Sequence, residues 1–415
     1  MASDTPSLWL VLPAGETASG GWIDDTLRER AAEKGLLGRT PLAGQFPRQR
    51  VEVVPSPGMG ADSAEHVQRL YRARGWTDGL PIVPPTTARV RAMLAFTDRK
   101  PTDVIGEVEP LKGLATLEKI AANAVMAGCR ADYFPVVMAA VEAVLDPAFN
   151  LRGLQTTDEN AAPLIVVNGP IARALDINGS FGALGPGWRA NATIGRALRL
   201  VLNNIGGGWP GAVSFAGLGH AGRYTMCLAE NEAQSPWPPL HTDTGHPRDA
   251  SAETLFRAET AINVTGGLAE IASVMGSAAS AFQILWSGIA TVLLSPATAT
   301  SLARDGLSKD DVARWLWRQG RWPADQWRTS WLYQTVASPE RWPAWVHTSA
   351  ADGAVAPTAS PEDIVIVVAG GDIPIAQHVY CPSWGFPPAR ITRQIALPRD
   401  WERLHAESRQ QETGR

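Results

Sequence analysis

Short, continuous apolar runs that end in a glycine or proline turn recur along this chain of 415 residues. They occupy residues 8–15 (LWLVLPAG), 80–85 (LPIVPP), 163–170 (PLIVVNGP), 290–296 (ATVLLSP) and 363–371 (DIVIVVAGG). A strand with one solvent-exposed face alternates apolar and polar residues. Continuous apolar runs therefore indicate strands that are covered on both faces, as in parallel sheets flanked by helices. The sequence therefore predicts an α/β fold with a mostly parallel or mixed sheet flanked by helices.

Helical spacing follows two of these runs: IARALDI after residue 170, and ATATSLARDG after residue 296, where Gly306 is placed to end a helix. Seven of the 16 Trp lie between residues 315 and 345, which favours a helical subdomain packed by Trp–Trp and Arg–Trp contacts, with a lid or dimer surface as the alternative. We expect an N-terminal extension (1–75), a main α/β domain (76–300), the Trp-rich subdomain (301–350), a strand-turn segment completing the α/β domain (351–400) and a tail (401–415).

Composition excludes several classes of protein. With 45% apolar residues and a net charge of −4, the chain is neither disordered nor basic enough for a typical nucleic-acid binder. Three Cys cannot form a disulfide framework and no signal peptide is evident, so we expect a reduced, cytoplasmic protein. Residues 271–303 carry no charge, but the serines inside the stretch and Pro296 favour a buried helix followed by a buried strand over a membrane span.

Residues 115–147 predict two helices, the first ended by Gly128 and the second capped by Asp132. Cys129 lies between them, where a helix N-terminus and the adjacent Arg130 would favour the nucleophilic thiolate. The alternative is a small, inert core thiol. Lys119 and Asn123 share a face of the first helix and would border a cavity or face water.

A glycine-rich segment, residues 178–211, leads into a predicted helix with Asn191 as its N-cap and Arg196 within it. Free N–H groups at the helix N-terminus, together with Arg189, would bind a carboxylate or a phosphate. The segment matches glycine-rich dinucleotide motifs only formally, since neither match follows a strand. No organic cofactor is therefore predicted.

Residues 224–246 contain a candidate acid/base set. Alternation along RYTMCLAENE places Glu230 and Glu232 on one face and Cys227 on the other, and His241 follows a proline-rich turn. A divalent metal site that also uses His220 and His246 is the alternative, although no metal motif such as HExxH is present. If the strand ends cluster, the Asn168 loop and the glycine turn at 369–371 would approach the same crevice.

Five motifs carry a resemblance to a known group of proteins: TDGLPIVPPT (77–86), EKIAANAVMAGC (118–129), RANATIGRA (189–197), AENE (229–232) and VVAGG (367–371). Over residues 76–395 the chain resembles members of a poorly characterised bacterial family found near or fused to UGSC-type thiol or selenocysteine proteins. The resemblance implies thiol-linked redox or carbon–sulfur chemistry with Cys129 and Cys227 as the positions of interest. Since the chain has no UGSC tetrapeptide, it would be the partner component or independent of that chemistry.

The residues together favour a cytoplasmic enzyme that acts on a small anionic metabolite by addition–elimination (a lyase or hydratase) or by hydrolysis. This reading places Cys129, Glu230 and Arg189 in one pocket. One alternative is a thiol-dependent oxidoreductase component, in which Cys129 and Cys227 cycle and a partner thiol protein assists. Another is a non-catalytic scaffold. No nucleic acid or membrane is expected as a partner, and homo-oligomer formation stays open.

Overall fold

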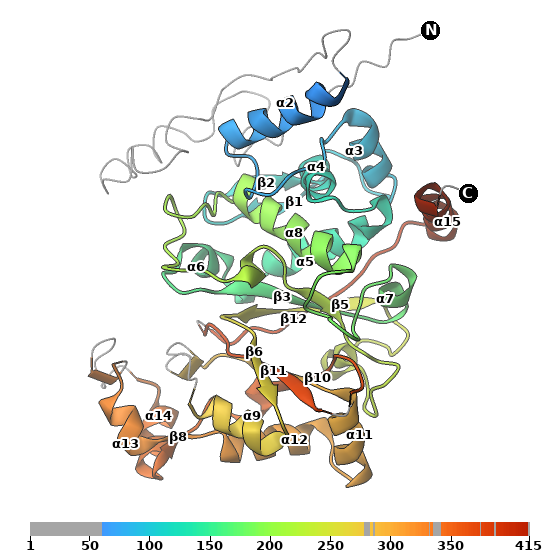
Figure 1. Cartoon of the computed structure of the whole chain (residues 1–415). Coiled ribbons are helices and arrows are strands. Elements are labelled where there is room, and N and C mark those ends of the chain that lie inside the picture. The colour runs from blue at the N-terminus through green and yellow to red at the C-terminus, as the bar shows by residue number, and fades with distance from the viewer. Residues whose placement is uncertain are drawn as a thin grey trace.

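The computed structural model describes residues 60–277, 283–284, 287–331, 333–334, 342–373, 375–385 and 387–413; side chains are described from residue 65. The predicted strand at 8–15 lies outside these residues. Two four-stranded sheets dominate the architecture and lie one above the other in Figure 1. Helices cover the outer face of each sheet, so the fold is α/β, as predicted.

Both large sheets are mixed. The first has the order β12 (Ile391–Gln394), β5 (Ala252–Ala258), β3 (Ala162–Asn168), β4 (Cys227–Ala229), and only β3 and β4 are parallel. The second has the order β10 (Ile364–Val368), β7 (Ala290–Leu294), β11 (Gln377–Cys381), β6 (Ile262–Thr265), and only β10 and β7 are parallel. Two ribbons complete the described strands, β1 (Val104–Val108) with β2 (Gly113–Thr116) and β8 (Trp322–Pro323) with β9 (Ala354–Val355).

Alternate residues of each strand enter different cores. Leu164 and Val166 of β3 join Val365 and Val367 of β10 in a cluster that lies between the two sheets. Ile165 and its alternating neighbours on β3 instead pack against the helices above the first sheet. The strands are therefore covered on both faces, as predicted, but a second sheet covers one face and helices cover the other. The result is a four-layer helix–sheet–sheet–helix arrangement (Figure 1).

The helices form the outer layers. Those above the first sheet are α4 (Leu117–Ala127), α5 (Phe134–Val144) and α8 (Arg189–Asn204), with α2 (Gly60–Ala73) and α3 (Thr87–Leu94) beyond them. Those below the second sheet are α9 (Leu268–Met275), α11 (Pro296–Arg304) and α12 (Lys309–Gln319). The others are α6 (Leu151–Thr156), α7 (Pro170–Ala174), α13 (Ala324–Thr329), α14 (Ala344–Ala351) and α15 (Trp401–Thr413), with short 3-10 turns at Ala131–Tyr133, Pro147–Phe149, Ala221–Arg223, Leu240–Thr244 and Pro361–Asp363.

Two local predictions were wrong. Residues 80–85 run extended but form no strand, because three prolines remove backbone donors and the N–H and C=O groups of Ile82 bond the side chain of Gln68. Asp132 does not cap α5; its carboxylate instead accepts hydrogen bonds from Arg130 (2.6 Å) and lies 2.8 Å from His405 Nδ1 on α15. The end of α4 at Gly128, with a φ of 92°, was predicted correctly.

The Trp-rich region contains a packed aromatic cluster, as the sequence predicts. Trp327 is fully buried and contacts Trp322 and Trp342 edge to face, each at 5.3 Å between ring centroids. Arg321 lies 4.9 Å from the ring of Trp317. These contacts hold α13 and α14 together beside the second sheet (Figure 1).

The charge-free stretch 271–303 contains the buried strand β7, as expected; part of it lies outside the described residues. No single helix in the described ranges is long and apolar enough to cross a membrane. One bent pair, Ala131–Val144 with Pro147–Thr156, meets the length and composition criteria jointly at an angle of 73°.

Candidate functional site

A cavity of about 300 Å³ lies between the C-terminal half of α8 and the glycine-rich segment that follows this helix. Its volume is at the lower end of the range for small-molecule pockets. The residues that line it are Asp78, Arg199, Asn203, Gly208, Trp209, Pro210, Ala216, Leu218, Gly219, His220, Arg223 and Tyr224. Two of these residues carry guanidinium groups and one, Asp78, carries a carboxylate that is paired with Arg196, so the lining has a surplus of positive charge.

Helix α8 supplies the inner wall. Arg196, Arg199 and Asn203 are separated by three and four residues and therefore lie on one face of the helix. Apolar residues such as Leu198 and Val201 face the core above the first sheet. The helix is amphipathic, and its polar stripe borders the cavity.

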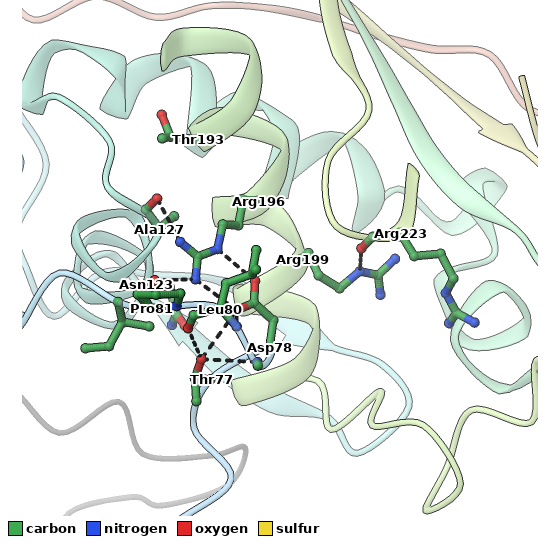
Figure 2. A network of polar contacts seen from close by, with 12 residues as sticks. Thr77, Asp78, Leu80, Pro81, Asn123, Ala127, Thr193, Arg196, Arg199 and Arg223 are labelled. Atoms are coloured by element: carbon green, nitrogen blue, oxygen red, sulfur yellow. Dashed lines mark hydrogen bonds and ion pairs between the residues drawn. The ribbon is translucent and has the colours of Figure 1, made fainter. Parts of the chain in front are cut away.

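Arg199 is 8% exposed and is held by two hydrogen bonds. Its Nε donates to the carbonyl of Arg223 at 2.8 Å (Figure 2). Its Nη1 donates to Gln155 at 3.3 Å. Arg223 is partly buried and donates from Nη2 to Ser214 Oγ at 2.9 Å. Within the described residues neither guanidinium has a carboxylate within 4.0 Å. Both positive charges therefore have no carboxylate partner in the part of the chain that the structure describes.

Burial makes these charges costly. Burial lowers the pKa of Arg199 to about 9, and the charge of Arg223 acts in the same direction, while the more weakly felt Asp78 opposes it. Burial also lowers the pKa of Arg223. A buried charge without a partner is unfavourable by several kcal/mol. An anion in the cavity would offset that cost for both residues.

Arg196 does not contribute to this surplus of positive charge, contrary to its predicted role in substrate binding. Its Nε and Nη2 donate to the two carboxylate oxygens of Asp78 at 2.8 and 2.9 Å, and Nη2 also donates to the carbonyl of Pro81. Figure 2 shows Arg196 directed toward Asp78, whereas Arg199 is directed toward Arg223. Arg196 thus fixes the turn at 77–81 against α8 and neutralises Asp78.

Two neutral polar residues complete the lining. His220 Nδ1 accepts the N–H of Gly222 at 3.1 Å, which places the ring proton on Nε2. Burial lowers the pKa of His220, and Arg223 lowers it further, which favours the neutral ring; its Nε2 atom is buried. Asn203 is 5% exposed, and its Oδ1 has no hydrogen-bond partner among the described residues.

The predicted anion site at the start of α8 is not formed as expected. Asn191 is not the N-cap: the cap is Trp188, and the Asn191 side chain bonds the backbone of Asn178 and Ala183. Arg189 donates to the carbonyl of Gly128 at 3.0 Å. The side chain of Asn191 therefore secures the 178–187 loop, because an amide can satisfy donors and acceptors of the backbone together.

The thiols are buried. Burial raises the pKa of Cys129 to about 12, which outweighs the lowering effects of its hydrogen bond to the carbonyl of Thr193 and of Arg189 and Arg196. Burial also raises the pKa of Cys227, and that of Cys381 to about 12. The sequence suggested that Arg130 would activate Cys129, but Arg130 is bonded to Asp132.

Lys119 and Asn123 stabilise the interior of the helical layer and do not line the cavity. Lys119 Nζ donates to the carbonyl of Leu114 at 3.2 Å. Asn123 is fully buried, donates to the Lys119 carbonyl and accepts a hydrogen bond of 2.8 Å from Asn204 on α8. These contacts join α4 to α8.

A second polar cluster forms where β3 and β4 end, as the sequence suggested. Glu230 Oε2 accepts hydrogen bonds of 2.6 Å from both Asn168 Nδ2 and the N–H of Leu240, and Glu230 Oε1 lies 3.3 Å from Lys309 Nζ. Glu232 Oε1 accepts from Asn168 Nδ2 at 2.9 Å and from the N–H of Gly169 at 2.7 Å. We call these residues the strand-end cluster: Asn168, Glu230, Glu232 and Lys309.

The glycine turn at 369–371 joins this region, because Asn231 donates to the carbonyls of Val368 and Gly370. His241 is fully buried, with Nε2 placed 3.0 Å from the carbonyl of Pro247, and forms no hydrogen bond with Glu230 or Glu232. No group of three or more His, Cys, Asp or Glu residues in the described part of the chain is arranged to hold a metal ion. The metal set suggested for these residues with His220 and His246 is therefore not assembled.

The cavity and the strand-end cluster lie at opposite ends of β3. The loop beside the cavity bonds the residues before β3, since Gly219 N–H donates to Asn160 at 2.6 Å, whereas Asn168 is the last residue of β3. At about 3.3 Å per residue, the seven residues of β3 separate the two sites by roughly 20 Å. The predicted single pocket containing Cys129, Glu230 and Arg189 does not match the described cavity, which none of the three lines.

Sequence reasoning missed Arg199, Arg223 and Asn203. The polar stripe at 196, 199 and 203 was readable as helical spacing, and it could have directed attention to the later turns of α8 rather than to its N-terminus. No pattern in the sequence around Arg223 indicates that its side chain lines the cavity. Comparison with protein-family models, curated proteins and solved structures found no match to this chain.

Proposed function

We propose that this protein is a cytoplasmic enzyme that binds a small anionic metabolite in the cavity beside α8, with Arg199 and Arg223 as the anion-binding residues. The observation that carries the proposal is the pair of guanidinium groups that border one cavity without a carboxylate partner in the described residues. Guanidinium groups match carboxylate and phosphate oxygens in geometry and charge. The proposed anion site thus moves from Arg189 and Asn191 to the later turns of the same helix.

Addition–elimination at a carbon next to a carboxylate is the reaction that best suits this lining. Fixed positive charge stabilises the negative charge that develops on the carboxylate when the neighbouring carbon loses its proton. His220 lines the same cavity as a neutral imidazole, so water in the cavity would accept the proton from carbon and return one to the departing group. A hydrolase that uses the same anion site is the second form of the proposal.

The thiol-dependent alternative has less support. All three cysteines are buried, and burial raises the pKa of each thiol. A thiolate nucleophile needs a lowered pKa and access to solvent. Alkylation of Cys129 in the native protein at pH 8 would restore that alternative; we expect alkylation only after unfolding.

The test of anion binding is isothermal titration calorimetry with acetate, inorganic phosphate and sulfate in a chloride-poor buffer. We expect saturable binding that weakens at least tenfold in Arg199→Gln and in Arg223→Gln, because each variant loses a charge-assisted contact. Arg318→Gln, an exposed arginine on α12, is the matched control and should bind like the wild type. Absence of saturable binding, or equal losses in the control, would refute the proposal.

The test of the reaction class is proton NMR in D₂O with saturated and 2-hydroxy carboxylates. Loss of the signal of the proton next to the carboxylate, dependent on Arg199, would support addition–elimination chemistry. Binding without exchange or turnover of any carboxylate would leave the anion site in place and refute the lyase form.

A further inference from the structure

The outer part of the cavity is apolar, in contrast to its cationic inner wall. Trp209, Leu218 and Tyr224 all line it, and all belong to the segment that follows α8. Leu218 is 94% exposed and Tyr224 48% exposed, so both present carbon surface to solvent. Scattered exposed apolar residues are ordinary, but here two exposed ones and the half-buried Trp209 line one cavity together with two arginines.

Hydrogen bonds of the backbone hold the segment that carries Trp209 and Leu218. The N–H groups of Leu218 and Gly219 both donate to Asn160 Oδ1, at 3.4 and 2.6 Å, and the N–H of Gly217 donates to the carbonyl of Asp158. The carbonyl of Trp209 accepts the N–H groups of residues 212–214. The apolar residues therefore sit on a loop that is hydrogen-bonded to the start of β3, so little ordering would be needed on binding.

We infer that the ligand is an amphiphilic anion, with a carboxylate or phosphate head group on Arg199 and Arg223 and an aromatic or branched apolar body against Trp209, Leu218 and Tyr224. This inference rests on the proposed function and adds the substrate class. The volume of about 300 Å³ fits a body of one ring and is small for a long acyl chain. The orientation follows from burial: Arg199 is 8% exposed, whereas Leu218 and Tyr224 are 94% and 48% exposed, so the head group would bind inward and the apolar body toward solvent.

The experiment compares four probes on the full chain by calorimetry: acetate, phenylacetate, inorganic phosphate and phenyl phosphate. We expect each phenyl compound to bind about tenfold or more tightly than its parent anion, since burying apolar surface favours binding. The tighter of the two phenyl compounds identifies the head group. Leu218→Ser, a change at a side chain that is 94% exposed, should weaken phenyl binding several-fold and leave acetate and phosphate unchanged.

Ile375→Ser is the matched control, because Ile375 is 63% exposed and does not line the cavity. Equal affinities for phenyl and parent anions, or equal losses for both in Leu218→Ser, would overturn the amphiphilic substrate class while leaving the anion site intact. If none of the four probes binds, both the inference and the proposed function fail. The two failures are therefore distinguishable.

Discussion

The strand-end cluster and the cavity beside α8 both contain buried charged side chains. In the described part of the chain, only the strand-end cluster supplies a partner of opposite charge. Glu230 is surrounded by donors, which are the amide of Asn168, the N–H of Leu240 and the ammonium of Lys309. Arg199 and Arg223 have neutral partners only, in the part of the chain described. A charge that the fold satisfies has a structural explanation, whereas a charge that the fold leaves uncompensated points to a ligand.

The largest effect should follow from breaking the compensated site. Lys309→Met removes the cation beside Glu230 and should lower the free energy of unfolding by about 3 kcal/mol, because a buried carboxylate loses its charged partner. Urea unfolding at pH 7 measures this. Adding Glu230→Gln to the variant should restore part of the loss, and a double variant no more stable than Lys309→Met would contradict the pairing.

Supplying an internal counter-charge to the cavity should have the next largest effect. Asn203→Asp keeps the side-chain shape and places a carboxylate in the lining beside Arg199. We expect anion affinity to fall more than tenfold and the free energy of unfolding to rise by about 1 kcal/mol. Calorimetry and urea unfolding report the two quantities, and unchanged affinity would show that Asn203 lies too far from the bound anion to matter.

Removing the charge of Arg199 should hardly change the free energy of unfolding. Arg199→Leu loses two hydrogen bonds but also a buried charge, so in anion-free buffer we expect a change of less than about 1 kcal/mol in the free energy of unfolding. The contrast with Lys309→Met is the informative result. A loss as large as that of Lys309→Met would mean that Arg199 is already compensated within the fold.

The last prediction concerns pH. Because the folded pKa of Arg199 is lowered to about 9 from 12.5, the unfolded state binds more protons between these values. The free energy of unfolding contributed by this group therefore rises as the pH increases through 9. Thermal unfolding from pH 8 to 10.5 should show the unfolding temperature of the wild type rising relative to that of Arg199→Gln. The opposite trend would contradict the claim that Arg199 is a buried charge without a carboxylate partner.

The sequence allowed much of the fold to be predicted. Continuous runs at 163–170, 290–296 and 363–371 all became strands, and Gly128 ended its helix as expected. The run at 80–85 failed because its prolines and the bonds of Ile82 to Gln68 replace sheet pairing. We expected more parallel strand pairs than the structure contains. A continuous apolar run shows only that both faces of a strand are covered, and here a second sheet covers one face as completely as helices would.

The candidate site was only partly predictable. The expectation from strand ends that meet at one edge joined the Asn168 loop to the glycine turn at 369–371; the structure adds Glu230 and Glu232 as direct partners of Asn168. The sequence could not show whether Arg196 or Arg199 would bind the anion, because both residues lie on the same face of α8. Asp78, distant in the sequence, pairs with Arg196 and leaves Arg199 without a carboxylate.

The sequence by itself determined which segments are buried on both faces, where α4 and α8 end, and that α8 carries a polar stripe, because these properties depend on local spacing and composition. Only the tertiary structure decided that two sheets stack, that the glutamates and the arginines lie at opposite ends of β3, and which charges are compensated. The physical reason is that electrostatic pairing depends on distances of a few ångströms between residues far apart in the chain.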